Sequence, residues 1–120
     1  MFRRRSMLAL AAVGSVATLV WTAPLAIAGQ DAAQIKRGQE VYTAQKCQLC
    51  HSIGGKGNKS NPLDGVGAKL SADDIRKWIT HPDEMTAQTK STKKPPMPKK
   101  YDKLPAADID ALVAYLQSLK

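Results

Sequence analysis

The feature that most constrains this chain is the pentapeptide Cys47–His51, in which two cysteines stand three positions apart and a histidine follows the second directly. Residues three and four positions apart lie on one face of a helical turn, so both thiols and the imidazole can project together. This spacing is typical of a c-type haem attachment site. It predicts one covalent haem c, with Cys47 and Cys50 bonded to the haem vinyl groups and His51 as an axial iron ligand.

Three other uses of these residues have to be weighed. A disulfide between Cys47 and Cys50 is chemically possible in an exported protein. A thioredoxin-type redox pair would need a βαβ context, and no alternating strand pattern is visible here. A zinc site needs four ligands, and it would use every cysteine and histidine of the chain: Cys47, Cys50, His51 and His81. Haem attachment is the preferred interpretation, and we expect His81 to be a helix-end residue rather than a ligand.

The N-terminus has the pattern of a secretory leader. A positive segment, residues 2–5, precedes an apolar run over residues 7–20, and Ala26–Ala28 offers the small-x-small pattern of a cleavage site. The sequence therefore predicts a signal peptide over residues 1–28, cleaved on export to the periplasm, followed by one domain over residues 29–120. If the leader is retained, its apolar run would instead anchor the protein in the membrane.

Charge and composition limit the classes of partner that this protein can bind. The formal net charge is +8, and loss of the three leader arginines lowers it to +5. Basicity alone is compatible with nucleic acid or an anionic membrane. Export and the lack of interleaved aromatic residues argue against nucleic acid, and we expect no stable membrane insertion after leader cleavage. The predicted mature domain has one tryptophan and no phenylalanine, so we expect haem to complete its core and the haem-free chain to be largely disordered.

Three helices are indicated by capping residues and hydrophobic periodicity. The first begins at Asp31, with Asp31 as N-cap and Gln34 completing a capping box, and runs into the pentapeptide. The second follows the N-cap Ser71 and ends at residues 81–82, since proline disfavours helical geometry in the residue before it. The third spans residues 106–119, where apolar residues recur on one face.

The remaining segments contain one informative glycine and two loops. Gly38 stands within the first helix, where glycine costs about 1 kcal/mol relative to alanine, so we expect another helix to approach closely there. Residues 54–67 are predicted to be turns and irregular chain. Residues 87–103 have no hydrophobic period and form a loop rich in lysine and proline, with Met97 in its middle.

Three features together carry a family resemblance. These are the pentapeptide Cys47–His51, the step Met97–Pro98 and the terminal run 108–116. With them, residues 31–120 resemble the small class I cytochromes c. The resemblance implies an all-α fold of three to four helices wrapped around one covalently attached haem, with the N- and C-terminal helices crossing in close contact. The family positions at that contact are matched by Gly38, Tyr42, Tyr115 and Leu116.

The resemblance also implies the second axial ligand. In the family it is a methionine just before a proline, in the loop that precedes the last helix, and Met97 matches this position. Flanking prolines restrict the backbone and remove amide donors, so the loop can hold a thioether at little ordering cost. Met85 is the runner-up, but it follows the second helix too closely and lacks the prolines.

Three further residues match family positions around the haem. Pro62 resembles the proline whose carbonyl accepts a hydrogen bond from the proximal imidazole of His51. Here Asn61 precedes that proline, in place of the usual glycine. Trp78 resembles a position whose indole N–H reaches a haem propionate, and Tyr101 is expected to pack beside the haem.

The resulting expectation is a monomeric, exported, one-electron carrier that is not an enzyme, because histidine and methionine leave the iron no open position. Acidic redox partner proteins are expected to dock near the lysines of the methionine loop: Lys90, Lys93, Lys94, Lys99 and Lys100. One alternative is an electron-transfer subunit of a larger dehydrogenase or sulfur-oxidising complex. Another is a haem enzyme or gas sensor with a labile sixth ligand. The sequence leaves the electron donor and acceptor open.

Overall fold

A computed structural model describes Gly14 and residues 24–120, with side chains from Asp31 onward. The predicted leader, residues 1–28, lies almost wholly outside these residues, apart from the start of the first helix. The chain is mostly helical, which confirms the all-α expectation. Its elements follow in the order α1 (Pro24–Ala44), the 3₁₀ turn η1 (Cys47–Leu49), β1 (Ser52–Ile53), β2 (Lys56–Gly57), α2 (Val66–Lys69), α3 (Ala72–Thr80), α4 (Pro82–Thr89), the 3₁₀ turn η2 (Tyr101–Lys103) and α5 (Ala106–Ser118).

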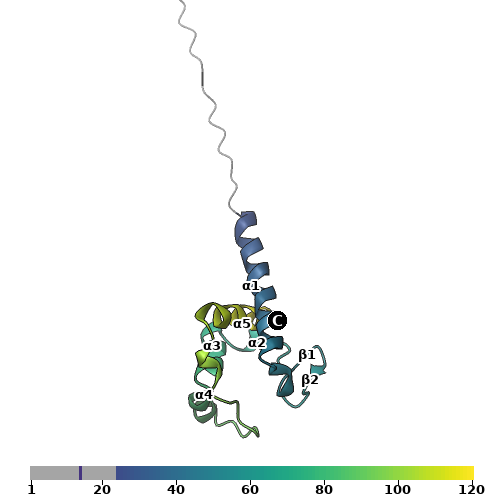
Figure 1. Cartoon of the computed structure of the whole chain (residues 1–120), viewed down its shortest axis with the longest axis vertical. Helices are drawn as coiled ribbons and strands as arrows, with labels where there is room; N and C mark the ends of the chain where they lie inside the picture. Colours follow the sequence, from purple (N-terminus) through teal and green to yellow (C-terminus); the bar gives the residue numbers. More distant parts are fainter. Residues whose placement is uncertain (1–13, 15–23) are drawn as a thin grey trace, which may run out of the picture.

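The helix pair α1 and α5 forms the most extensive contact in the domain, and the two helices cross in Figure 1. Gly38 makes this crossing possible. A Cβ atom built on Gly38 would overlap the backbone carbonyl of Ala111 and lie 2.5 Å from the Cβ of Tyr115. The predicted close approach of another helix at Gly38 is therefore confirmed.

The hydrophobic core is built from α5, α3 and the end of α1, which contributes Val41 and Tyr42. The last helix buries Ile109, Leu112, Val113 and Leu116, and α3 contributes Ile75 and Ile79. The predicted cap of α3 is confirmed, because the backbone N–H of Asp74 donates to the Ser71 hydroxyl at 3.1 Å. The cap fixes where α3 begins, and this decides which of its side chains face α5.

A second close contact joins α2 to the end of α5. The backbone N–H of Gly67 donates to the carbonyl of Leu119 at 2.8 Å, and the Gln117 side-chain amide donates to the carbonyl of Gly67 at 2.7 Å. A Cβ on Gly67 would overlap the main chain of Gln117. The sequence predicted irregular chain here. The hydrogen-bond partners of α2 lie about fifty residues further along the chain, so the sequence around α2 alone does not indicate a helix there.

The first helix differs from the prediction at both ends. It begins at Pro24, so Asp31 lies in its interior and the predicted capping box is wrong. Proline suits the first turn of a helix, where its missing N–H has no intrahelical partner, and the helix continues from there through Gly29 to Asp31. The predicted leader boundary after Ala28 thus falls inside α1. At the other end, α1 stops at Ala44, and Lys46 adopts a left-handed conformation with φ 55° before η1.

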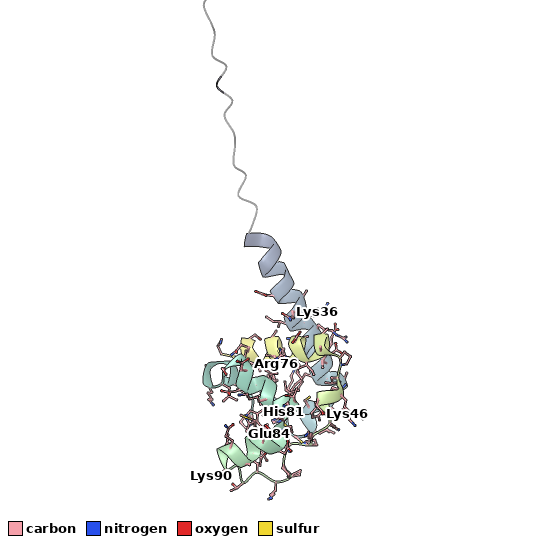
Figure 2. The ribbon with its side chains drawn as sticks, turned by 90° about the vertical axis from the view of Figure 1, so that its left-hand side faces the viewer. Lys36, Lys46, Arg76, His81, Glu84 and Lys90 are labelled. Atoms are coloured by element: carbon pink, nitrogen blue, oxygen red, sulfur yellow. The ribbon has the colours of Figure 1, made fainter. Side chains whose placement is uncertain are left out.

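Helix α4 was not predicted. Pro82 both ends α3 and occupies the first turn of α4, while Asp83 and Glu84 lie near the positive end of the new helix. Figure 2 shows His81 and Glu84 close to where the two helices join, with Lys90 beyond them at the end of α4. Within residues 24–120 no helix is long and apolar enough to cross a membrane.

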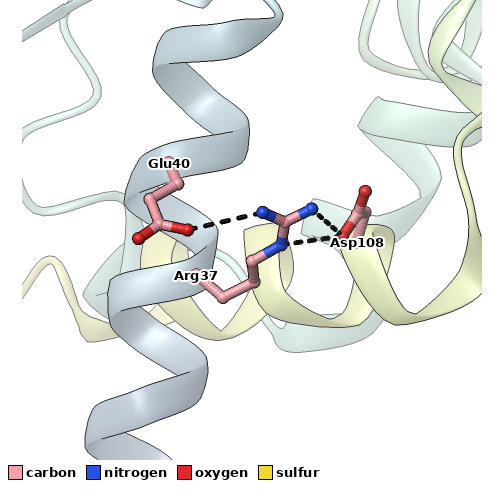
Figure 3. A network of polar contacts seen from close by, with 3 residues as sticks. All are labelled: Arg37, Glu40 and Asp108. Atoms are coloured by element: carbon pink, nitrogen blue, oxygen red, sulfur yellow. Dashed lines mark hydrogen bonds and ion pairs between the residues drawn. The ribbon is translucent and has the colours of Figure 1, made fainter.

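An exposed ion-pair network ties α1 to the start of α5 (Figure 3). The Arg37 guanidinium donates twice to one oxygen of Asp108, through Nε at 3.0 Å and Nη2 at 2.9 Å, and also contacts Glu40 at 3.4 Å. Asp108 lies in the first turn of α5, where a carboxylate also interacts favourably with the helix dipole. Pro105, the N-cap residue of α5, forms no side-chain hydrogen bond to the first turn of the helix. The carboxylate of Asp108 stabilises the beginning of α5 instead.

Candidate functional site

A cavity of about 320 Å³ lies among η1, α3, α5 and the loop that follows α4. Its lining is predominantly apolar and combines the predicted haem-binding residues with part of the core. The main lining residues are Tyr42, Cys47, Cys50, His51, Leu63, Val66, Leu70, Ile75, Trp78, Ile79, Met97, Tyr101, Leu112 and Leu116.

The pentapeptide reaches this cavity as one tight turn. The backbone N–H groups of Cys50 and His51 both donate to the carbonyl of Cys47, at 3.2 and 3.0 Å. The left-handed Lys46 turns the chain sharply just before it. As a result, Cys47, Cys50 and His51 all line the cavity, and both thiols are free rather than joined in a disulfide. Burial raises the pKa of the Cys47 thiol to about 11.

The ring of His51 is oriented by the carbonyl of Asn61, which lies 3.2 Å from its Nδ1. A carbonyl only accepts, so Nδ1 carries the proton in this contact and Nε2 is left with a free lone pair. The predicted acceptor, the carbonyl of Pro62, is therefore wrong by one residue. Burial lowers the pKa of His51, an effect that the hydrogen bond to Asn61 opposes. Burial thus favours the neutral imidazole, which is the form that ligates iron.

Asn61 has a second contact that holds the turn in shape. Its side-chain amide donates to the carbonyl of Cys50 at 3.1 Å, while its own carbonyl also accepts from the N–H of Ser52 at 3.2 Å. Pro62 itself is exposed and does not line the cavity. The sequence analysis missed Asn61. The available signal was its place before proline, which favours extended backbone and leaves its carbonyl free to point away from the local chain.

The two candidate methionines occupy different environments. Met97 is half-buried and lines the cavity, together with Pro95, Pro96 and Pro98 from the same loop. Met85 is 5% exposed on α4 and is not among the lining residues. A buried methionine away from the cavity is explained by packing alone.

Aromatic side chains form part of the wall. Trp78 and Tyr101 both line the cavity. Tyr42, which the resemblance assigned to the helix contact, lines it as well. Its hydroxyl is buried without a hydrogen-bond partner in the described part of the chain, and burial raises the pKa of Tyr42 to about 12. A phenol in such a site stays protonated and can donate a hydrogen bond.

His81 is exposed at the junction of α3 and α4, with its Nδ1 2.8 Å from the Thr80 hydroxyl. It does not line the cavity. Among the described residues no three histidine, cysteine or acidic side chains gather as a metal-binding group. The zinc site considered from the sequence is thus not assembled in residues 24–120.

Comparison with known protein families gives a match. The profile of the family described as cytochrome c matches residues 35–120. Neither the curated proteins nor the solved structures that were searched contain a match.

The residues at the cavity fit the covalent haem of this family. Two free thiols and an imidazole line one cavity with a thioether, and the rest of the lining is mostly apolar, as a porphyrin face requires. The family match covers well over half of the chain. The chain therefore belongs to the cytochrome c family, carries covalently bound haem c and is a haem-binding electron carrier.

Proposed function

We propose that this protein is an exported monohaem cytochrome that transfers single electrons between partner proteins, with His51 and Met97 as axial iron ligands. The observation that carries the proposal is the cavity in which Cys47, Cys50, His51 and Met97 meet. When bound, haem c supplies a one-electron couple between ferric and ferrous iron, and histidine–methionine ligation raises its potential.

The chain's own residues have three tasks in this proposal. Cys47 and Cys50 hold the haem covalently. Asn61 keeps His51 in the tautomer whose Nε2 is free for iron, and such outer partners orient metal ligands. The proline-flanked loop holds Met97 in place with few backbone states to lose. A ligand set that stays unchanged between redox states suits electron transfer rather than substrate chemistry.

Export and domain limits belong to the same proposal. Residues 1–28 act as a signal peptide that is removed, and residues 29–120 form the functional domain in the periplasm. The positive segment, the apolar run and the Ala26–Ala28 step support this. Class I cytochromes c are in general exported to such compartments.

We further propose that acidic partners dock around the cavity. Residues 46–61 and 90–101 both border it, and together they hold eight lysines and no acidic residue, so all ten acidic residues of the chain lie elsewhere. In Figure 2, Lys46 and Lys90 lie on different sides of the lower part of the domain, away from Lys36 on α1. A field of one sign steers an acidic partner and weakens with salt. Electron transfer to an acidic protein should therefore slow as ionic strength rises. Association that persists at high salt would instead indicate a fixed subunit of a larger complex.

Visible spectroscopy of the exported protein tests the ligands. Oxidised wild-type protein should show a haem spectrum with a sulfur-to-iron charge-transfer band. Met97→Ala should keep the haem and lose this band, since Met97 lines the cavity. The matched control Met85→Ala should keep the band, because Met85 does not. A band that survives in Met97→Ala contradicts the ligand assignment, and a colourless wild-type protein contradicts the whole proposal.

A further inference from the structure

The loop over residues 91–100, which carries Met97, has few hydrogen bonds of its own. Ser91 N–H donates to the carbonyl of Thr86 at 3.0 Å where the loop begins, and Lys100 N–H donates to the carbonyl of Pro98 at 3.2 Å where it ends. Three prolines in between have no N–H to donate. Within the described chain, this loop makes a single hydrogen bond to a segment other than the adjoining α4.

That hydrogen bond runs from the Lys93 ammonium to the carbonyl of Ser60, at 3.0 Å. Ser60 directly precedes Asn61, whose carbonyl orients His51. Lys93 and Asn61 both line the cavity. The bond therefore connects the loop of one proposed axial ligand to the loop that orients the other, at the border of the cavity.

Another polar contact of a loop side chain, to α4, is weaker. Lys99 lies 3.9 Å from Asp83 of α4, with both side chains more than half exposed. At that distance the pair is not hydrogen-bonded, and exposed ion pairs contribute little. Because the prolines stiffen the loop, an attachment at Lys93, four residues before Met97, restrains the position of Met97 as well.

We propose that Lys93 is a positioning residue that holds the Met97 loop closed against the loop around Ser60. In the closed arrangement Met97 keeps its place, and small molecules are excluded from that side of the iron. A ligand that competes with Met97 binds with an affinity set by the fraction of molecules whose loop is open. This inference rests on the proposed ligation by Met97.

The test is a titration of the oxidised, haem-loaded protein with imidazole, a neutral competitor for iron, followed through the sulfur-to-iron band. A charge-assisted bond at an exposed site gives a modest effect, so Lys93→Ala should bind imidazole about two- to fivefold more tightly than wild type. The control Lys94→Ala removes the neighbouring charge without the bond and should match wild type. Lys93→Arg, which keeps donor and charge, should recover at least half of the difference.

Each other result overturns the proposal in a recognisable way. If Lys93→Ala and Lys94→Ala both bind imidazole more tightly than wild type by the same factor, only the loss of charge matters. Unchanged affinity in Lys93→Ala would mean that the bond does not restrain the loop. Met97→Ala, in the same titration, separates the two ideas: it should bind imidazole far more tightly than any lysine variant. If it does not, the ligation by Met97 fails. If it does while Lys93→Ala matches wild type, only the role of Lys93 fails.

Discussion

At the scale of single residues, three buried or half-buried tyrosines couple stability to pH. The rings of Tyr42 and Tyr115 meet edge to face, with centroids 5.9 Å apart. Burial is the main cause that raises the pKa of Tyr42 to about 12, and it also raises the pKa of Tyr101 and of Tyr115. Burial disfavours the phenolate, so the folded protein keeps these protons longer than the unfolded chain does.

A pH dependence with a defined sign follows for Tyr42. Its pKa is about 10 in the unfolded chain, so its contribution to stability is fully present below that pH. The unfolded state loses the proton first, so the free energy of unfolding should fall as pH rises from about 10 towards 12. Tyr42→Phe should show a shallower fall than wild type in denaturant unfolding at about pH 8, 10 and 11. Parallel curves would contradict a buried, protonated Tyr42.

At the scale of elements, two glycines decide how closely helices approach α5. Gly38 allows α1 to cross it, and Gly67 allows α2 to touch its end. At both positions an added Cβ would meet backbone atoms, which cannot rotate away as a flexible side chain can. The contact at Gly67 also satisfies the carbonyl of Gly67, which accepts from Gln117 and from the Lys120 ammonium at 2.8 Å.

Gly67→Ala should therefore lower the free energy of unfolding by about 1–3 kcal/mol, the usual cost of overpacking, although alanine is the better helix former. The measurement is denaturant unfolding of the haem-loaded protein. Ala68→Ser is a suitable control, because Ala68 is exposed in the same short helix. Equal stability of Gly67→Ala and wild type would show that α2 can move off α5 without cost.

At the scale of the whole molecule, the same residues form part of the hydrophobic core and part of the cavity lining. Six residues of the buried core also line the cavity: Tyr42, Ile75, Ile79, Tyr101, Leu112 and Leu116. Large aromatic residues are scarce in the domain, which has one tryptophan, Trp78, while the single phenylalanine of the chain, Phe2, lies outside it. A small domain of this kind depends on its cofactor to bury enough apolar surface.

The chain without haem should therefore be largely unfolded. A double variant, Cys47→Ser with Cys50→Ser, removes both proposed attachment points but leaves the other residues that line the cavity in place. Its far-ultraviolet circular dichroism should show much less helix than the haem-loaded wild type, and its unfolding should lose cooperativity. A native-like helical spectrum in the haem-free variant would contradict this account, because the packed helices would then suffice by themselves.

Much of the fold follows from local patterns. The Ser71 cap, the buried face of α5 and the need for a close neighbour at Gly38 each depend on a few adjacent residues, and the structure agrees with all three. The beginning of α1 was mispredicted because Asp31 is a good N-cap by type. The helix already begins at Pro24, so Asp31 is not at its end and no cap is needed there.

The candidate site, like the fold, was predictable from the sequence only in part. The sequence alone predicted which residues bind haem, because the spacing of Cys47, Cys50 and His51 is contained in one turn. Only the tertiary structure decided that Asn61 and not Pro62 faces His51, that Met97 and not Met85 lines the cavity, and that Lys93 reaches Ser60. These contacts depend on how loops far apart in the chain close upon each other. Loop closure is set by the packing of α1, α3 and α5, and no short stretch of sequence contains that information.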